Sequence, residues 1–351
     1  MDTAGQIIRF IRWKDWGPGK LTILWSICLY IAVAYNLPFE QFALTFVVFM
    51  IFAASQSALG YVLNNWGDRE LDRKQFKSNP FNGRSRLEAV LSLTLVIVTA
   101  FVTGLPLALR PGFSILWLAW VVATVSYSIE PARLKTKGVA GLAVSFVAQW
   151  LLPVLISFAA FVVADGWDMW LLALALMVTG ATLEIAHQRY DRERDRLARA
   201  ETFAAGLSDA KIDRIYAIVL VLDKFAIGLV IAIDIWALRL IQTDWAWALA
   251  AILGSAYLVL FALTLVGTFR SLSKAEIVDP YYGPRLAIPS PAQLMHETLL
   301  NFGAPLVMGI AATIRSPLYA IVLGLFLIWR VVLGGADWRW PLRALRQRVL
   351  K

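Results

Sequence analysis

Long apolar runs constrain the fold of this chain more than any other feature of its sequence. The runs cover residues 21–37, 41–64, 87–109, 113–129, 140–164, 168–188, 215–239, 246–268, 294–314 and 317–335. A helix needs about 20 consecutive apolar residues to cross the hydrocarbon core of a bilayer. We therefore predict an all-α bundle of nine to ten transmembrane helices, forming one integral-membrane domain over residues 1–351. In the nine-helix alternative, the polar run that begins at Leu294 is tilted or partly re-entrant.

Composition excludes several other classes of protein. The chain is 59% hydrophobic and 16% charged, whereas a soluble domain is about 45–50% apolar and about 25% charged. One cysteine and two histidines exclude an intrachain disulfide and a metal site rich in cysteine or histidine. The net charge of +9 does not indicate nucleic acid, because basic residues of a membrane protein follow its topology first.

The basic residues also predict the orientation. With the ten runs as spans, 28 of the 33 lysines and arginines fall on one side of the membrane. Such an excess marks the cytosolic side, so we expect both termini in the cytosol, in a bacterial cell membrane. Three long connections, 65–86, 189–214 and 269–293, lie on that side. Long connections in a compact bundle are commonly functional, which places the mouth of any active site in the cytosol.

Two polar ladders follow the second and sixth apolar runs. The first consists of Asn64, Asp68 and Asp72, and the second of His187, Asp191 and Asp195, with Glu184 one turn deeper. The spacing i, i+4, i+8 puts each set on one face of a helix that continues beyond the membrane. Four helices separate the ladders, which indicates a duplicated four-helix unit with one ladder in each copy.

The ladders have the chemistry of a divalent-cation site. Stacked carboxylates repel one another unless a cation lies between them, and Mg²⁺ prefers carboxylate, water and phosphate oxygens. Two ladders facing one another across a cavity could hold Mg²⁺ ions with a diphosphate between them. The basic loop residues Arg133, Lys135 and Lys137 could then neutralise diphosphate oxygens. The alternative is that the carboxylates only cap helices or face solvent, and that the basic residues only anchor the topology.

Three motifs in order resemble the UbiA superfamily of intramembrane prenyltransferases. They are Asn64-x-x-x-Asp68-x-x-x-Asp72, the Tyr-Ser-x-x-Pro-x-Arg-x-Lys stretch at 127–135, and Asp191-x-x-x-Asp195. The resemblance implies a helical bundle whose cavity opens to lipid and is capped on the cytosolic side. It also implies Mg²⁺-dependent transfer of a prenyl group from a prenyl diphosphate to a lipophilic or aromatic acceptor. This chain departs from the family pattern at His187, where many members carry an acid.

The resemblance assigns roles to individual residues. The metal ligands would be Asn64, Asp68, Asp72, Asp191 and Asp195, and the four aspartates would be catalytic. With Asn64, the resemblance also makes Arg133 and Lys135 contacts of the diphosphate. Further candidates for substrate binding, taken from the residues themselves, are His187, Tyr190, Arg73, Lys77 and Gln149. Candidate aromatic faces for a carbocation are Tyr61, Phe146, Trp150 and Tyr190.

Several alternatives remain open at this point. A terpene cyclase of the same superfamily would use the same aspartates, and a membrane transporter is a more distant alternative. The stripe Ser145–Gln149 lines an acceptor pocket or forms hydrogen bonds between helices. Asp223 and Lys224 lie within a predicted span. Because adjacent helical residues project in different directions, these two side chains cannot be assumed to pair.

Overall fold

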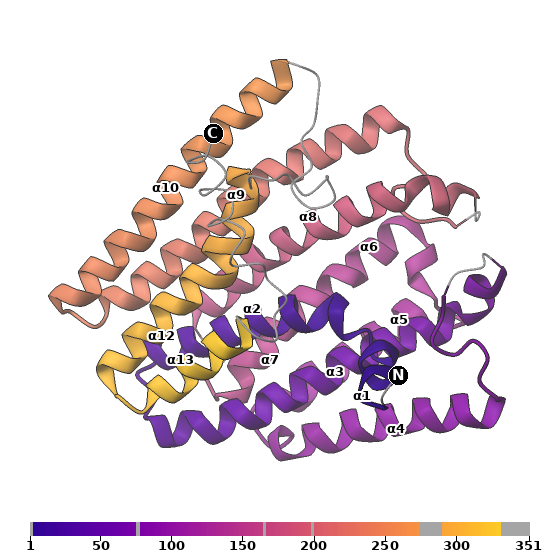
Figure 1. Cartoon of the computed structure of the whole chain (residues 1–351), viewed down its shortest axis with the longest axis horizontal. Coiled ribbons are helices and arrows are strands. Elements are labelled where there is room, and N and C mark those ends of the chain that lie inside the picture. The colour runs from indigo at the N-terminus through magenta and orange to yellow at the C-terminus, as the bar shows by residue number, and fades with distance from the viewer. Residues whose placement is uncertain (1–2, 75–77, 164–165, 198–199, 274–289, 331–351) are drawn as a thin grey trace.

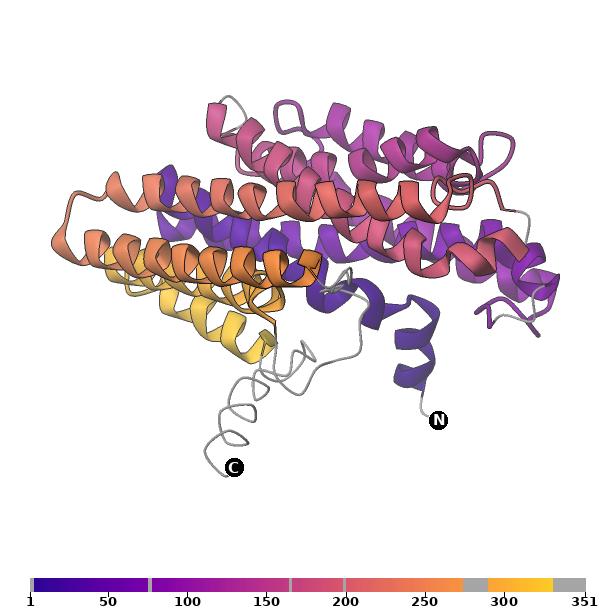
Figure 2. The ribbon, with the colours of Figure 1, turned by 90° about the horizontal axis from the view of Figure 1, so that it is seen from above.

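The computed structural model describes residues 3–74, 78–163, 166–197, 200–273 and 290–330. Figure 1 shows a bundle of long helices that run side by side, and Figure 2 shows the same bundle from above. Within the described residues the only pairing of β type is an isolated bridge between Gly138 and Thr202. The predicted all-α class is confirmed.

The elements follow the apolar runs. In chain order they are α1 (Thr3–Phe10), α2 (Trp13–Ala34), α3 (Phe39–Lys74), α4 (Arg86–Gly104), η1 (Leu105–Leu107), α5 (Phe113–Ser128), η2 (Leu134–Thr136), α6 (Gly138–Phe146), η3 (Val147–Leu151), α7 (Leu152–Ala160), α8 (Trp167–Leu197), α9 (Asp209–Arg239), α10 (Asp244–Ser273), α11 (Pro291–Gln293), η4 (Leu294–Gly303), α12 (Ala304–Arg315) and α13 (Tyr319–Ile328). The last predicted run extends past residue 330, where the described part of the chain ends.

Seven of these helices, or continuous series of helices, are long and apolar enough to cross a membrane. They include α6 to α7, which are joined through the π-helix η3, and α11 to α12, which are joined through the π-helix η4. Two further apolar helices, α5 and α13, are shorter, and α9 carries charged residues along its length. The run at Leu294 is part of a continuous helical segment, Pro291–Arg315, that is long and apolar enough to cross a membrane.

Burial separates central helices from peripheral ones. In α2, 67% of the most apolar window is buried inside the protein, whereas in α4 and α10 the share is 17%. The peripheral helices expose large apolar side chains such as Leu95 and Leu258. In a soluble protein such faces would be costly, but lipid solvates them without penalty. The central position of α2 explains its contacts with α3, α7, α9, η4 and α12.

A charged triad lies between α9 and η4, and in it Asp223 and Lys224 pair although they are adjacent in the helix. Asp223 Oδ2 lies 2.5 Å from Lys224 Nζ and 2.7 Å from His296 Nε2. The Asp223 side chain is fully buried. The flexible four-carbon stem of lysine lets its ammonium reach round the helix to the neighbouring carboxylate. The Tyr257 hydroxyl of α10 donates to the Lys224 carbonyl at 3.2 Å, so the triad joins three helices.

We predict that Lys224→Met destabilises the bundle by about 3–5 kcal/mol, because it removes the cation nearest to a buried carboxylate. Thermal denaturation in detergent, followed by size-exclusion chromatography, measures the loss. The double variant Asp223→Asn/Lys224→Met is the control, and it should recover most of the stability because neither charge remains. Equal melting temperatures for Lys224→Met and the native chain would contradict a stabilising role for the pair.

Candidate functional site

A cavity of about 250 Å³ lies among α2, α3, α5 to α8 and η3. Along α3 its lining changes from Phe49 and Phe52 to Tyr61 and Asn64. His187 of α8 lines it too, so the first residues of both ladders border the same cavity. Figure 1 shows the α3–α4 and α8–α9 connections at one end of the bundle, which is therefore the end that carries the ladders.

The first ladder lies on a helix, as predicted, because α3 continues unbroken to Lys74. Lys135 Nζ lies 2.6 Å from Asp68 Oδ1 and donates to Asn64 Oδ1 at 2.8 Å. Arg133 Nη2 lies 3.1 Å from the same Asp68 oxygen. Burial lowers the pKa of Lys135, and the Asp68 carboxylate opposes that shift. The predicted basic loop thus contacts the ladder directly.

A glycine permits this close approach. A Cβ atom at Gly67 would overlap the backbone carbonyl oxygen of Ser128, at the end of α5. The segment that follows α5 can therefore reach Asp68, the next residue on α3. Arg133 itself has a φ of 33°, in the left-handed region, which non-glycine residues adopt at a cost and chiefly at functional sites.

Asp72 is oriented by a residue that the sequence did not single out. Asn79 Nδ2 donates to Asp72 Oδ2 and to the Asn65 carbonyl, both at 2.8 Å. The Asn79 Oδ1 atom accepts the backbone N–H of Phe81 at 3.0 Å. The described part of the α3–α4 connection, which begins at residue 78, thus folds back onto the ladder. The hydrogen bonds of Asn79 help to hold it there.

The second ladder lies on the last turns of α8. Asp191 Oδ2 is 3.7 Å from His187 Nε2, and Asp191 Oδ1 is 3.4 Å from Arg194 Nη1. Asp195 Oδ2 accepts a hydrogen bond from Thr202 Oγ1 at 3.0 Å. Asp191 thus lies beside residues of its own helix, whereas Asp68 has two cations from a distant loop beside it.

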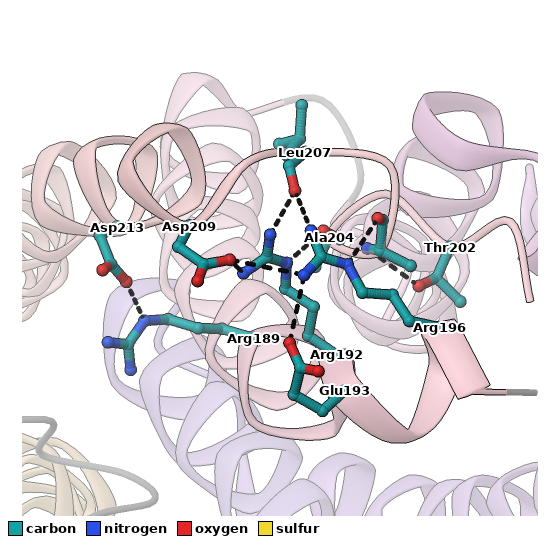
Figure 3. A network of polar contacts seen from close by, with 10 residues as sticks. Arg189, Arg192, Glu193, Arg196, Thr202, Ala204, Leu207, Asp209 and Asp213 are labelled. Atoms are coloured by element: carbon teal, nitrogen blue, oxygen red, sulfur yellow. Dashed lines mark hydrogen bonds and ion pairs between the residues drawn. The ribbon is translucent and has the colours of Figure 1, made fainter.

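Arginines on another face of α8 hold the α8–α9 connection (Figure 3). The guanidinium of Arg192, which is only 6% exposed, donates to the carbonyls of Ala204 and Leu207 and to Asp209. The hydrogen bond from Arg192 holds the pKa of Asp209 below its usual range. Arg189 Nε bonds Asp213 Oδ1 at 2.6 Å. These arginines therefore hold the described part of the connection in place.

The remaining predicted residues divide between the cavity and the surface. Gln149 lines the cavity and donates to Ser145 Oγ at 2.7 Å. Tyr190 is 57% exposed, and Arg73 pairs with the exposed Glu70 at 2.8 Å, so the structure does not bring these two to the cavity. Lys77 lies outside the described residues. Of the aromatic candidates, Tyr61 and Trp150 line the cavity, and Phe146 packs in a separate core cluster with Leu142 and Tyr216.

Three charged residues line the cavity without having been predicted to do so. Arg12 and Lys20 come from the N-cap of α2 and from α2 itself, and Glu184 comes from α8. Both basic residues precede the first apolar run, so the sequence predicts them to lie outside the membrane. Glu184 was noticed as a deeper member of its ladder, but without a role.

The ladders fit Mg²⁺ by their donor chemistry. Among the described residues no group of three or more His, Cys, Asp or Glu side chains is gathered to hold a metal ion. Each ladder nevertheless presents two carboxylates one turn apart, and Mg²⁺ is commonly bound by one or two carboxylates together with substrate phosphates. Arg133 Nε is buried without a hydrogen-bond partner among the described residues, so this guanidinium retains a donor for an anion.

Known proteins share both the sequence pattern and the fold. The UbiA prenyltransferase family matches residues 21–276. A UbiA homologue from Archaeoglobus fulgidus has a similar structure, with a TM-score of 0.54 and 14% identity over 91% of this chain and 99% of its own. The structure of a digeranylgeranylglyceryl phosphate synthase is also similar, with a TM-score of 0.54 and 14% identity over 89% of this chain and 99% of its own. No protein of curated function matches the sequence.

One further structure is informative through its ligands. The Archaeoglobus fulgidus homologue bound to GPP and Mg²⁺ has a TM-score of 0.51 and 15% identity, over 91% of this chain and 99% of its own. At these identities the likeness establishes the fold of this chain, including the predicted UbiA-like bundle.

We predict that Arg192→Ala opens the α8–α9 connection, because backbone carbonyls that lose a buried donor cost about 1–3 kcal/mol each. Limited proteolysis should cut the variant between residues 200 and 208 faster than the native chain, and its melting temperature should fall. Glu193→Ala on the neighbouring exposed position is the control and should behave as the native chain does. Equal cleavage of both variants would show that Arg192 does not hold the connection.

Proposed function

Because this chain belongs to the UbiA prenyltransferase family, we propose that it transfers a prenyl group from a prenyl diphosphate to a lipophilic or aromatic acceptor inside the membrane, with Mg²⁺. The observation that carries this proposal is the meeting of Asp68, Arg133 and Lys135 beside a cavity whose deeper lining is apolar. A prenyl diphosphate has that combination of a charged head and an apolar chain. The homologue that binds GPP and Mg²⁺ supports the same choice of donor and ion.

The basic pair would bind the diphosphate. The Nε atom of Arg133 has no hydrogen-bond partner among the described residues and is available to an anion. Lys135 lies between Asn64 and Asp68. Asp68, Asp72, Asp191 and Asp195 would hold Mg²⁺, whose positive charge would offset the charge that develops on the diphosphate. Lys135 and Arg133 would donate to phosphate oxygens beside it. Such preorganised cations are most effective where water is excluded.

The cavity would protect the reacting carbon. In the proposed reaction the bond from C1 of the prenyl chain to the diphosphate breaks, and its electron pair leaves with the diphosphate. Phe49 and Phe52 line the deep part of the cavity and exclude water there. The faces of Tyr61 and Trp150 would stabilise the allylic cation by about 0.5–2 kcal/mol each. The acceptor then forms the new bond to C1 and loses a proton, which the Glu184 carboxylate in the lining would take.

A transferase is favoured over a terpene cyclase by the polar part of the lining. Lys20, Ser145 and Gln149 border the cavity, and a cyclase, whose cation is attacked by its own double bonds, has no use for such groups. We further propose that both termini and the mouth of the cavity face the cytosol of a bacterial cell, following the excess of basic residues at that end.

We predict that Asp68→Asn and Asp191→Asn each lower turnover at least about 100-fold, the loss typical of removing one charged group from such a site. Diphosphate release from purified protein in detergent, with geranyl, farnesyl and geranylgeranyl diphosphates, measures the rate. Glu70→Gln is the matched control, because Glu70 lies on α3 between Asp68 and Asp72 but is exposed, and its ion pairs among the described residues are with Arg69 and Arg73. Full activity of both aspartate variants, with an unchanged melting temperature, would refute the metal assignment.

A second measurement separates transferase from cyclase. With donor and Mg²⁺ but no acceptor, a transferase should bind the donor in a Mg²⁺-dependent manner and release little diphosphate. Mass analysis of the organic extract checks the products. Rapid release of diphosphate with a cyclic hydrocarbon or alcohol would identify a cyclase, and no binding of any donor would refute both activities.

A further inference from the structure

A buried carboxyl group lies near the end of the bundle opposite the ladders. Asp234 is part of α9, close to the end of that helix at Arg239, and only 3% of the residue is exposed. Its Oδ2 atom has no hydrogen-bond partner among the described residues, and no ion pair of those residues includes Asp234. A buried carboxylate costs free energy unless a cation or hydrogen-bond donors lie beside it. Asp234 is therefore a candidate ligand of a bound ion.

A second, small cavity of about 20 Å³ adjoins Asp234, between α2, α8, α9 and η4. Ser26 and Tyr30 of α2 also line it, and the rest of its lining is apolar. Asp234 is thus the only charged side chain that borders this space among the described residues. A cavity of this size holds one water molecule or one small ion, and it excludes an organic ligand.

The Tyr30 hydroxyl is arranged as an acceptor. It donates its hydrogen bond to Asp168 Oδ2 at 2.5 Å, and a hydroxyl that donates in this way keeps its lone pairs for another partner. Asp168 also accepts from the Tyr35 hydroxyl at 2.9 Å and lies in the first turn of α8, where the helix dipole favours a negative charge. Asp168 thus has partners of its own, and the Tyr30 oxygen has lone pairs to offer.

The oxygen groups that border the small cavity come from two helices. Neither the Ser26 nor the Tyr30 hydroxyl is a hydrogen-bond partner of Asp234 Oδ2, so a species between them is needed to join them. A water molecule can do this, but it carries no charge to offset that of the carboxylate. A cation does both, and carboxylate and hydroxyl oxygens are the ligands that hard cations prefer. One carboxylate matches one positive charge, which favours a monovalent ion.

We propose that this cavity binds a sodium ion, with oxygens of Asp234, Ser26 and Tyr30 as its protein ligands. The small volume favours sodium over the larger potassium ion. The ion joins α9 to α2, the most buried of the candidate spans. Along α8 the distance from Asp168 to Asp195 of the second ladder is about 40 Å, at about 1.5 Å per residue. The sodium site is therefore separate from the ladders, and the inference does not depend on prenyl transfer.

Sodium binding is measured on the full-length protein in detergent, with EDTA present to remove divalent ions. Melting temperatures are compared in sodium, potassium and choline chloride at the same ionic strength. We expect a saturable rise in sodium and a smaller one in potassium. A ligand that binds only the folded state raises the ratio of folded to unfolded protein by about 100-fold at 100 times its Kd. Binding of radioactive sodium to the same protein should then saturate at a single ion for each chain.

Variants test the ligands. Asp234→Asn keeps the shape of the side chain and removes its charge, so it should abolish sodium binding and the rise in melting temperature. Ser26→Ala should weaken the affinity for sodium by about 10-fold, the low end for a contact with a charged group. Asp244→Asn, at an exposed carboxylate in the first turn of α10, is the matched control and should bind sodium as the native chain does. If Asp234→Asn fails to fold, Ser26→Ala and the native chain still decide the question.

Three outcomes would overturn the inference. Equal melting temperatures in the three salts, with no bound radioactive sodium, would show that a proton neutralises Asp234 instead. An equal rise in sodium and potassium chloride would be a general effect of salt. Sodium binding that Asp234→Asn leaves unchanged would place the ion elsewhere, and its loss in Asp68→Asn would identify the first ladder as that place.

Discussion

The ion pair of Asp68 with Lys135 and Arg133 is the interaction on which the arrangement of the site depends. It joins α3 to the connection between α5 and α6, two segments that the chain separates by more than sixty residues. Carboxylates stacked on one helix face would otherwise repel each other, and partly buried charges require partners. The pair therefore gives the ladder a stable structure and also keeps two cations at the place where a diphosphate would need them.

At the end of the bundle that carries the ladders, the α5–α6 connection contacts the α8–α9 connection. The backbone N–H of Gly138, which follows Lys135 and its turn, donates to the Glu201 carbonyl at 2.9 Å. Thr202 beside it bonds Asp195, and Arg192 holds the rest of that connection from below (Figure 3). The two ladders are thus linked through loops rather than by direct contact between carboxylates. A ligand that binds both ladders would replace this indirect link by a direct one.

Local periodicity made the helices and both ladders predictable, because apolar runs and i, i+4 spacing are properties of short segments. The place of Lys20 in the cavity lining was not predictable in this way. Lys20 precedes the apolar run that begins at residue 21, whereas α2 begins at Trp13 and passes through it. The bond from Asn79 to Asp72 and the pairing of Asp223 with His296 depend on how distant segments fold together. No short-range pattern carries that information.

The uninterrupted length of α3 has a mechanical consequence. At about 1.5 Å per residue its 36 residues span about 54 Å, against about 30 Å for the hydrocarbon core. The portion in lipid and the portion that carries Asp68 and Asp72 are therefore one rod, and the same holds for α8 with Asp191 and Asp195. Helices respond to a thinner bilayer by tilting. A change in membrane thickness therefore changes the distance between the two acidic ladders. The rate of the reaction then depends on the lipid composition of the membrane.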